Sequence, residues 1–336
     1  MNCAIETSRT IRPAGQLVFR AAMAGILLAL LLFAAPATSR AGTLYVSNHG
    51  NNTIWDFTAP NAATPPVAGS LFANTGLDGP ILMAFDSGGN LYVANANNNG
   101  IEKYANSGGG VLNPSGSPVP ILGLDNPRAM AFDSFGNLYV ANANNNTIRM
   151  YSPTGGLFSG LGITYANAGT GLDIPNALAF NNSTLYVSNF GSNTVEAITA
   201  PFTATTYADA SSGLDGPNAL AFDTSGNLFV SNYLGNNVEK FTAQFNGTLY
   251  AGGLNNPVGL AFDSTGSLYV ANSGNSTIET ITAPLTASLF TDSSQGLSTP
   301  YGLAFQPVPE PATWALLAGG FGALFLFMRR RSGTAG

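Results

Sequence analysis

Two short sequence signatures alternate along the chain, and their spacing constrains the fold more than any other feature. The first is a predicted strand ending in Ala-Phe, with its phenylalanine at Phe85, Phe132, Phe180, Phe222, Phe262 and Phe305. The second is a predicted strand of the form Leu-aromatic-Val-small-Asn, with its aromatic residue at Tyr45, Tyr92, Tyr139, Tyr186, Phe229 and Tyr269. Copies recur every 40 to 48 residues, which is the repeat length of a four-stranded propeller blade. The sequence therefore predicts an all-β, six-bladed β-propeller.

The two signatures are out of phase at the ends of the repeat array. Residues 42–57 carry the second strand with no first strand before it, and residues 296–305 carry the first strand with nothing after it. Each end supplies what the other lacks. We therefore expect the N-terminal strands to share one blade with the C-terminal strand, so that residues 42–307 close a ring large enough to bury a core.

One repeat, such as residues 76–104, shows how each blade is built. Gly-Leu-x-x-Pro leads into the first, innermost strand, and Asp-x-x-Gly-Asn (Asp86 to Asn90) predicts a hairpin turn that the aspartate caps and the glycine closes with a positive φ. The apolar Leu-Tyr-Val strand is expected to be covered on both faces. A third strand (residues 101–104 here) and a more variable fourth strand complete the blade.

The first 41 residues have the features of a secretory signal peptide. Arg9, Arg12 and Arg20 precede or open an apolar core at residues 21–35, and small residues precede Gly42. Cleavage after Ala37 and a retained membrane helix are the alternatives. The single cysteine, Cys3, is lost with the leader, so the mature protein has neither a disulfide nor a cysteine nucleophile.

The C-terminal residues combine a short motif, an apolar stretch and a basic tail. Pro309-Glu310-Pro311 is followed by 17 apolar residues (312–328) and then by Arg329, Arg330 and Arg331. This stretch is just long enough to cross a bilayer, with its arginines in the cytoplasm. The segment resembles the PEP-CTERM sorting signal of Gram-negative bacteria. That resemblance implies a transient inner-membrane anchor, cleavage by exosortase, and release to the cell surface or its exopolysaccharide; a permanent anchor is the alternative.

Without its two ends the chain is strongly acidic. Seven of the 11 basic residues and two of the 17 acidic residues lie in the leader and the tail, which leaves a net charge near −11. This balance argues against nucleic acid or anionic polysaccharide as a partner.

The repeat Pro-x-x-hydrophobic-Ala-Phe-Asp-x-x-Gly-Asn-Leu-Tyr-Val-Ala-Asn resembles NHL-repeat propellers over residues 42–306 and, more distantly, the gluconolactonase and streptogramin-lyase group. These families include scaffolds, peptide and RNA binders, and hydrolases. The chain departs from the common Val-Ala-Asp by placing asparagine at positions 48, 95, 142, 189, 232 and 272. We expect these asparagines to bond turn backbone.

Few residues are suited to catalysis. His49 is the only histidine, and a surface turn position is favoured over a catalytic base. The streptogramin-lyase pattern implies a histidine pair with a metal, and the gluconolactonase pattern implies a divalent ion in the channel. No cofactor is expected; calcium at the repeated Asp86, Asp133, Asp223 and Asp263 is the alternative to turn capping. The glutamates at 102, 196, 239 and 279 are expected on a solvated outer face.

Function in a repeat array is expected where the repeats differ. The position after the repeated proline, at the channel mouth, holds Ile81, Arg128, Asn176, Asn218, Val258 and Tyr301. Together with His49, Phe190 and Tyr233 from neighbouring turns, the residues Arg128, Asn176, Asn218 and Tyr301 are predicted to form a polar and aromatic site for a sugar or peptide. A water-filled channel lining is the alternative.

These observations predict a secreted, exosortase-sorted propeller that binds a surface protein or a neutral glycan without catalysis. A metal-dependent lactonase or hydrolase of the gluconolactonase type is the second interpretation, and a purely architectural spacer is the third.

Overall fold

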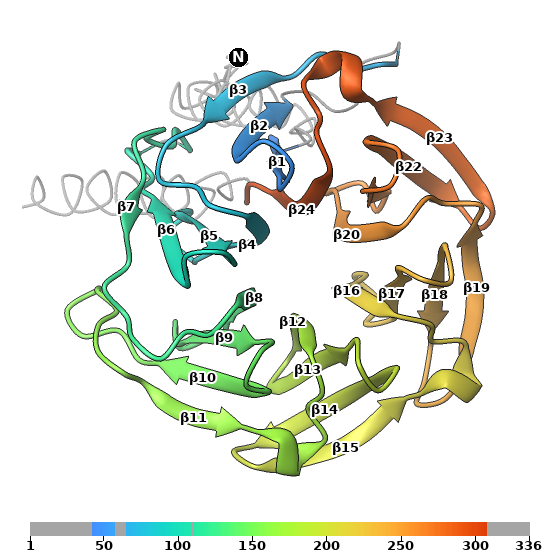
Figure 1. Cartoon of the computed structure of the whole chain (residues 1–336). Coiled ribbons are helices and arrows are strands. Elements are labelled where there is room, and N and C mark those ends of the chain that lie inside the picture. Colours follow the sequence, from blue (N-terminus) through green and yellow to red (C-terminus); the bar gives the residue numbers. More distant parts are fainter. Residues whose placement is uncertain (1–41, 58–64, 109, 308–336) are drawn as a thin grey trace, which may run out of the picture. The chain divides into compact units, whose positions relative to one another are not determined.

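The computed structural model describes residues 42–57, 65–108 and 110–307 of the 336-residue chain. These residues form six four-stranded antiparallel sheets around a central axis (Figure 1). Three single-turn 3-10 helices, Ala168–Thr170, Ala210–Ser212 and Ser293–Gln295, precede three of the innermost strands. The predicted six-bladed propeller is confirmed.

Each blade repeats four strands in the same order from the axis outward. The innermost strands are β24 (Pro300–Phe305), β4 (Pro80–Phe85), β8 (Pro127–Phe132), β12 (Pro175–Asn181), β16 (Pro217–Phe222) and β20 (Pro257–Phe262). The second strands are β1 (Leu44–Asn48), β5 (Leu91–Asn95), β9 (Leu138–Asn142), β13 (Thr184–Asn189), β17 (Leu228–Asn232) and β21 (Leu268–Asn272). The third strands are β2 (Thr53–Phe57), β6 (Gly100–Tyr104), β10 (Thr147–Tyr151), β14 (Thr194–Ala200), β18 (Asn237–Phe241) and β22 (Thr277–Ala283). The outer strands are β3 (Ser70–Ala73), β7 (Ser117–Pro118), β11 (Ile163–Ala166), β15 (Thr203–Ala208), β19 (Gly247–Gly252) and β23 (Thr286–Thr291).

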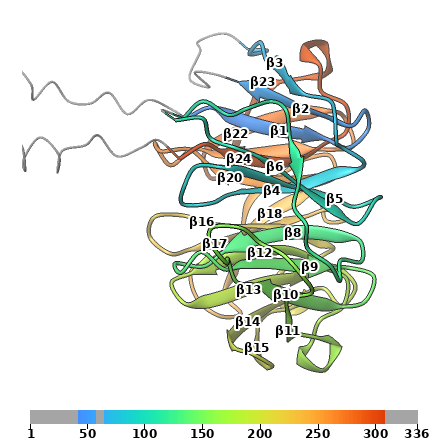
Figure 2. The same ribbon diagram turned by 90° about the vertical axis from the view of Figure 1, so that its left-hand side faces the viewer.

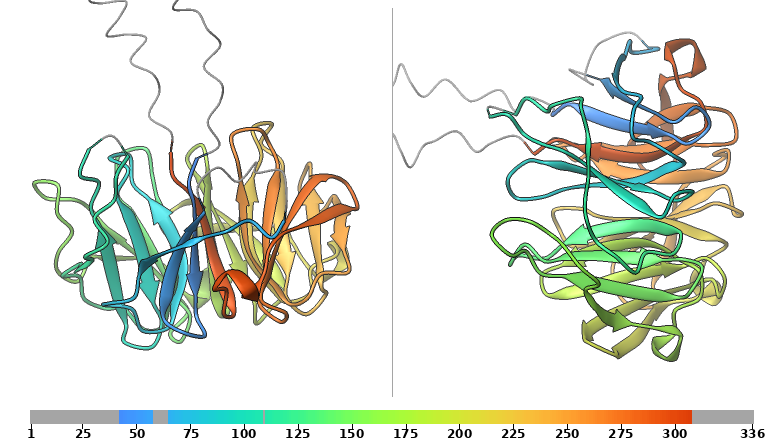
Figure 3. Two further views of the ribbon diagram at one scale, coloured as in Figure 1. Left: turned by 90° about the horizontal axis from the view of Figure 1, so that it is seen from above. Right: turned by 60° about the vertical axis from the view of Figure 1, so that its left-hand side comes forward.

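The two ends of the described chain share one blade, as the phase of the repeats predicted. The sheet order is β24-β1-β2-β3, and Leu44 lies opposite Phe305 in the antiparallel ladder. The amide of Gln306 also donates to the carbonyl of Thr43 at 2.9 Å. The ring is therefore closed by main-chain hydrogen bonds between its first and last strands, which Figure 3 shows side by side.

The two repeated signatures form a single contact between neighbouring blades. The aromatic residue of each second strand packs edge-on against the Ala-Phe phenylalanine of the next blade, with ring centroids 5.0–5.8 Å apart. The series ends with Tyr269 against Phe305, which joins the last blade to the closing one. Since an edge-to-face pair contributes about 0.5–1.5 kcal/mol beyond its buried area, six such pairs explain why both signatures recur.

The repeated asparagine at the end of each second strand holds the loop that enters the innermost strand. In the blade of β4–β7, the Oδ1 of Asn95 accepts from the amide of Asp78 at 3.2 Å, and its Nδ2 donates to the carbonyl of Gly76 at 2.8 Å. Asn95 is 1% exposed, so these bonds satisfy buried backbone groups. The predicted structural role of the asparagines is confirmed.

The Asp-x-x-Gly-Asn segments form the predicted hairpin turns. In the first of them, Oδ1 of Asp86 accepts from the amides of Gly88 and Asn90, each at 2.9 Å, and Gly89 has a φ of 74°. The other carboxylate oxygen accepts from Nδ2 of Asn90 at 2.7 Å. The same arrangement recurs at Asp133 and Asp223.

The strands run between two chemically distinct faces of the ring, which Figure 2 shows from the side. The mouth face carries the starts of the innermost strands and the turns between second and third strands, such as residues 96–99. The terminus face carries the first and last described residues, the Asp-x-x-Gly-Asn turns, and the connections between third and outer strands.

Residues 1–41 and 308–336 lie outside the described part of the chain. The predicted leader, the apolar stretch 312–328, Pro309, Glu310, Pro311 and the three terminal arginines are therefore not placed. Across the described ranges, no helix is both long and apolar enough to cross a membrane.

Candidate functional site

The residue after the repeated proline lies at the start of each innermost strand, on the mouth face. In order along the chain these residues are Ile81, Arg128, Asn176, Asn218, Val258 and Tyr301. The two asparagines are almost fully buried, at 1% and 3% exposure, whereas Arg128 and Tyr301 are partly exposed. The structure therefore gathers the four predicted polar and aromatic residues at one end of the channel. That they bind a ligand remains a prediction.

Serine hydroxyls in the second strands fix the backbone of this ring of residues. Oγ of Ser188 accepts from the amide of Ala177 and donates to the carbonyl of Asn218 in the next blade, both at 2.9 Å. Ser231 bridges Ala219 and the carbonyl of Val258 in the same way, at 2.8 Å. These buried bridges lock the relative positions of adjacent innermost strands.

Two side-chain amides hold the guanidinium of Arg128. Its Nε donates to Oδ1 of Asn126 at 3.0 Å, and its Nη1 donates to Oδ1 of Asn176 at 2.8 Å. Because Asn176 uses its oxygen on the arginine, its Nδ2 is left buried with no hydrogen-bond partner. The arginine is therefore fixed in place, and its support retains an unused donor.

A second pair of residues has the complementary deficit. Nδ2 of Asn218 donates to the hydroxyl of Tyr301 at 3.2 Å, which leaves Oδ1 of Asn218 buried without a partner. The ring of His49 lies 6.2 Å from that of Tyr301. The mouth thus holds an unused buried donor on one side and an unused buried acceptor on the other.

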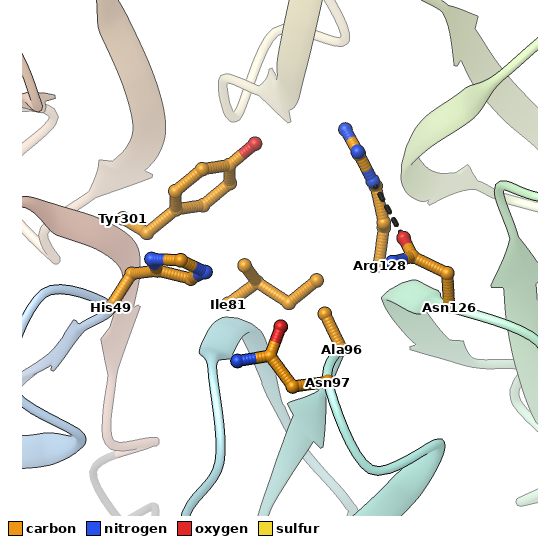
Figure 4. A pocket seen from close by; sticks show the side chains of 7 residues that line it. All are labelled: His49, Ile81, Ala96, Asn97, Asn126, Arg128 and Tyr301. Atoms are coloured by element: carbon orange, nitrogen blue, oxygen red, sulfur yellow. Dashed lines mark hydrogen bonds between the residues drawn. The ribbon is translucent and has the colours of Figure 1, made fainter.

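A cavity of about 210 Å³ opens between these groups, and Figure 4 shows the side chains that line it. The lining residues are His49, Ile81, Ala96, Asn97, Asn126, Arg128 and Tyr301. Three of them (His49, Arg128 and Tyr301) belong to the predicted site. Asn176 and Asn218 contact the cavity's walls through Arg128 and Tyr301.

The other two predicted residues form a separate pair. Phe190 and Tyr233 are 6.2 Å apart, from neighbouring turns of the mouth face, and do not line the cavity. Asn97 and Asn126, which do line it, were missed by the sequence analysis. Asn97 sits in the same turn series as His49, and Asn126 directly precedes a repeated proline, so their positions in the repeat were the available signal.

The mouth does not fit a divalent cation. Calcium takes six to eight oxygen ligands, usually including carboxylates. The cavity lining has no carboxylate and includes the guanidinium of Arg128, which would repel a cation. In the portion of the chain that the structure describes, no three His, Cys, Asp or Glu side chains are grouped to hold a metal ion.

The repeated aspartates lie on the opposite, terminus face and cap turns. Burial acts to raise the pKa of Asp223, but hydrogen bonds from Asn227 and the turn amides, together with the charge of Lys240 3.9 Å away, hold that pKa below its usual value. Asp263 differs because Ser267 replaces the usual asparagine, and its Oδ2 is buried without a partner. These carboxylates are spent mainly on turn backbone, one aspartate per turn.

The expected solvated face for the third-strand glutamates is wrong. Glu102, Glu196 and Glu239 are only 5–8% exposed, and Glu279 is partly buried. Each of the first three packs against the glycine that opens Gly-Leu-x-x-Pro in its own blade, as Glu102 does against Gly76. Burial raises the pKa of all four carboxyls above the usual glutamate value.

Family models match two parts of the sequence. A model described as NHL repeat matches residues 254–279, and one described as PEP-CTERM protein-sorting motif matches residues 307–331. No curated protein matches the chain significantly. Both resemblances inferred from the repeats and the C-terminal motif are confirmed.

Solved structures resemble the propeller as a whole. A chain of a nidogen/laminin complex has a TM-score of 0.66 at 16% identity, covering 79% of this chain and 98% of that one. A streptogramin B lyase has a TM-score of 0.56 at 14% identity (80% and 92% covered), and a putative gluconolactonase has 0.50 at 15% (65% and 79%). At such identities the likeness shows the fold alone.

Proposed function

We propose that the propeller is a non-catalytic binding module of the cell surface or extracellular matrix, delivered there by exosortase. The PEP-CTERM motif implies an exported, exosortase-processed protein. In this proposal residues 312–328 hold the precursor transiently in the inner membrane of a Gram-negative cell, with the three terminal arginines on the cytoplasmic side. Cleavage near Pro309-Glu310-Pro311 then releases the ring toward the surface and its exopolysaccharide.

The observation that carries the binding proposal is the pair of unsatisfied amide groups at the channel mouth. Nδ2 of Asn176 can donate one more hydrogen bond, and Oδ1 of Asn218 can accept one. A buried polar group without a partner costs about 1–3 kcal/mol, so a ligand that pairs with both groups recovers this free energy. Hydroxyl groups both donate and accept, which makes a neutral glycan the ligand class that fits best. The rings of Tyr301 and His49 add surfaces against which a sugar can pack.

The size of the cavity indicates how much of a ligand it holds. Sites for whole small molecules typically measure about 300–1,000 Å³. The mouth cavity, at about 210 Å³, suits the terminal group of a larger molecule. A glycan chain end is therefore a better match than a free cofactor, and an exposed loop of a surface protein is the alternative ligand.

A metal-dependent lactonase of the gluconolactonase type is the competing function. It requires a divalent ion held in the channel by acidic and amide side chains. Here Arg128 occupies the mouth and the lining carries no carboxylate. The donor set therefore supports the binding module, and we propose no resident cofactor.

Binding to matrix glycans tests the proposal. The secreted protein is titrated with glycans extracted from the producing cells, beside a variant carrying Arg128→Ala, Asn176→Ala and Asn218→Ala. Asn98→Ala, an exposed change on the same face, is the matched control. We expect saturable binding that the triple variant loses and the control keeps. Unchanged binding in the triple variant would refute the site, and absence of any saturable ligand would favour an architectural spacer.

Metal analysis separates the enzyme from the binding module. A stoichiometric ion that survives dialysis, raises the melting temperature and accompanies lactone hydrolysis would overturn the non-catalytic proposal. Sorting is tested separately: without exosortase, the uncleaved precursor should remain in the membrane fraction.

A further inference from the structure

The terminus face carries a ring of exposed apolar side chains. Each described connection between a third and an outer strand presents one of them, in the blades that begin with β4, β8, β12, β16 and β20. These residues, here called the apolar rim, are Val111, Leu157, Phe202, Phe245 and Leu285, and they are 48–67% exposed. An exposed apolar residue is unremarkable singly, but one at the same place in every described blade is a pattern.

The mouth face has the opposite chemistry. Its turns between second and third strands are made mostly of Asn, Gly and Ser, as in the segments 96–99 and 143–146. Leu234, 52% exposed, is the single large apolar residue exposed in these turns within the described chain. The ring therefore has one polar face and one face with an apolar rim.

Three members of the apolar rim also occupy an unfavourable backbone conformation. Phe202, Phe245 and Leu285 have φ values of 56°, 55° and 58°, in the left-handed region that bulky residues avoid. Elsewhere this chain fills such positions with asparagine, for example Asn99 and Asn146. The fold could use asparagine or glycine in these turns as well. Exposure and strain at the same residues point to a role outside the fold.

The course of the chain indicates what lies opposite this face. Gln306 is bonded to Thr43 on the terminus face, and the apolar stretch 312–328 begins five residues after Pro307. Five residues span at most about 17 Å when fully extended. Because the headgroup layer on each side of a bilayer is about 5–8 Å thick, an inserted span would keep this face within roughly 10 Å of the headgroups.

We propose that the apolar rim docks on the surface of the lipid bilayer while the precursor awaits exosortase. This inference rests on the proposed sorting route. Phenylalanine and leucine tips of this kind insert into the boundary between headgroups and acyl chains. The net charge near −11 favours zwitterionic over anionic lipid. Docking orients the mouth face, with its cavity, away from the membrane and toward matrix ligands.

Site-specific fluorescence on the full chain tests this orientation. The chain carries Cys3→Ser and one new cysteine, at Phe202→Cys or Leu285→Cys, labelled with an environment-sensitive dye and reconstituted into phosphatidylcholine vesicles. Leu234→Cys on the mouth face is the matched control. We expect a blue shift and several-fold weaker quenching by iodide at the two rim positions, with neither change at the control.

Two further measurements make every outcome decisive. Co-sedimentation with vesicles reports anchoring: a chain that stays in the supernatant refutes the proposed membrane intermediate itself. A chain that sediments but whose rim dyes remain as accessible as the control refutes docking alone. A shift that follows protein concentration without lipid would assign the rim to a second copy, and a shift that needs exosortase would assign it to that protein; either overturns the lipid proposal.

A variant guards against misfolding as an explanation. Replacing Phe202, Phe245 and Leu285 together by asparagine keeps residues suited to a positive φ, so the melting temperature should not fall. A dye at Leu157→Cys should then lose its protection from iodide, while Leu234→Asn leaves it unchanged. Full protection in the triple variant would contradict the proposal.

Discussion

Asn48 joins two segments that are about 250 residues apart, and its replacement by alanine should loosen the closing blade. Its Nδ2 donates to the carbonyl of Gly296 at 3.4 Å, and its Oδ1 accepts from the amide of Ser298 at 3.1 Å. The side chain is fully buried. Leaving two buried backbone groups unpaired costs about 1–3 kcal/mol each, partly offset by relaxation, so Asn48→Ala should lower the free energy of unfolding by about 2–4 kcal/mol. For a domain of this size that corresponds to a melting temperature lower by roughly 5–15 °C.

Asn142→Ala provides a matched comparison within a continuous stretch of chain. Asn142 makes the same two bonds, to the amide of Asp125 at 3.1 Å and the carbonyl of Gly123 at 3.4 Å, but with partners only 17 and 19 residues away. Both variants should lose similar stability. They should differ in where the ring opens first, because only Asn48 clasps the two ends together.

Trp55 makes this difference measurable. It lies in β2 of the closing blade, packed against Gly296, and it is the only tryptophan in the described chain. In urea titrations of the secreted protein, Asn48→Ala should shift the Trp55 fluorescence transition to lower urea than the far-ultraviolet circular dichroism transition. In Asn142→Ala the two should coincide. The reasoning fails if Asn48→Ala unfolds within about 0.5 kcal/mol of wild type, or if its two probes report one common transition.

Three further changes test other parts of the structure. Burial raises the pKa of Glu239, so the folded protein holds that proton more tightly than the unfolded chain; the group stabilises most below its usual pKa of 4.5, and this contribution is lost as pH rises through the raised pKa. Glu239→Gln should therefore raise the melting temperature at neutral pH and flatten its pH dependence, and an unchanged pH profile would contradict this. Phe202→Asn should remove about 1–2 kcal/mol of backbone strain and leave stability equal or higher, whereas a clear loss in thermal denaturation would show that the phenylalanine packs more than its exposure indicates. Gly296→Ala should cost about 1–3 kcal/mol, since φ is 89° and a Cβ there would overlap the ring of Trp55; thermal denaturation at the wild-type temperature would argue against that contact.

The fold was predictable because the sequence repeats both halves of one contact. The tyrosine of Leu-Tyr-Val and the phenylalanine of Ala-Phe meet across each pair of blades, so their out-of-phase spacing already implied that Tyr269 and Phe305 join the ends. The turn aspartates and strand-end asparagines act on nearby segments. Their roles therefore followed from short-range patterns.

The environment of the glutamates depended on a loop whose course the sequence does not show. Glu102 lies between Ile101 and Lys103 in a strand of alternating character, which is typical of a solvated face. The glycine of Gly-Leu-x-x-Pro, on the path in from the previous blade, closes over it instead. Only the absence of a Cβ at Gly76 permits that approach.

Part of the channel mouth was predictable for a similar reason. The position after each proline had to face the axis, so Arg128 and Tyr301 were found from the repeat. Which neighbours complete the cavity depends on how residues of adjacent blades meet, and this brought in Asn97 and Asn126 while leaving Phe190 and Tyr233 apart.

The shared closing blade also sets the timing of assembly. β24 is the last strand to be synthesised, and until it reaches β1 the ring has two open edges able to pair with other chains. The apolar residues of the sorting segment follow β24 by only a few positions. A chain that stops short of Phe305 therefore lacks both its latch and its address label, so every copy that carries the address also carries the strand needed to finish folding.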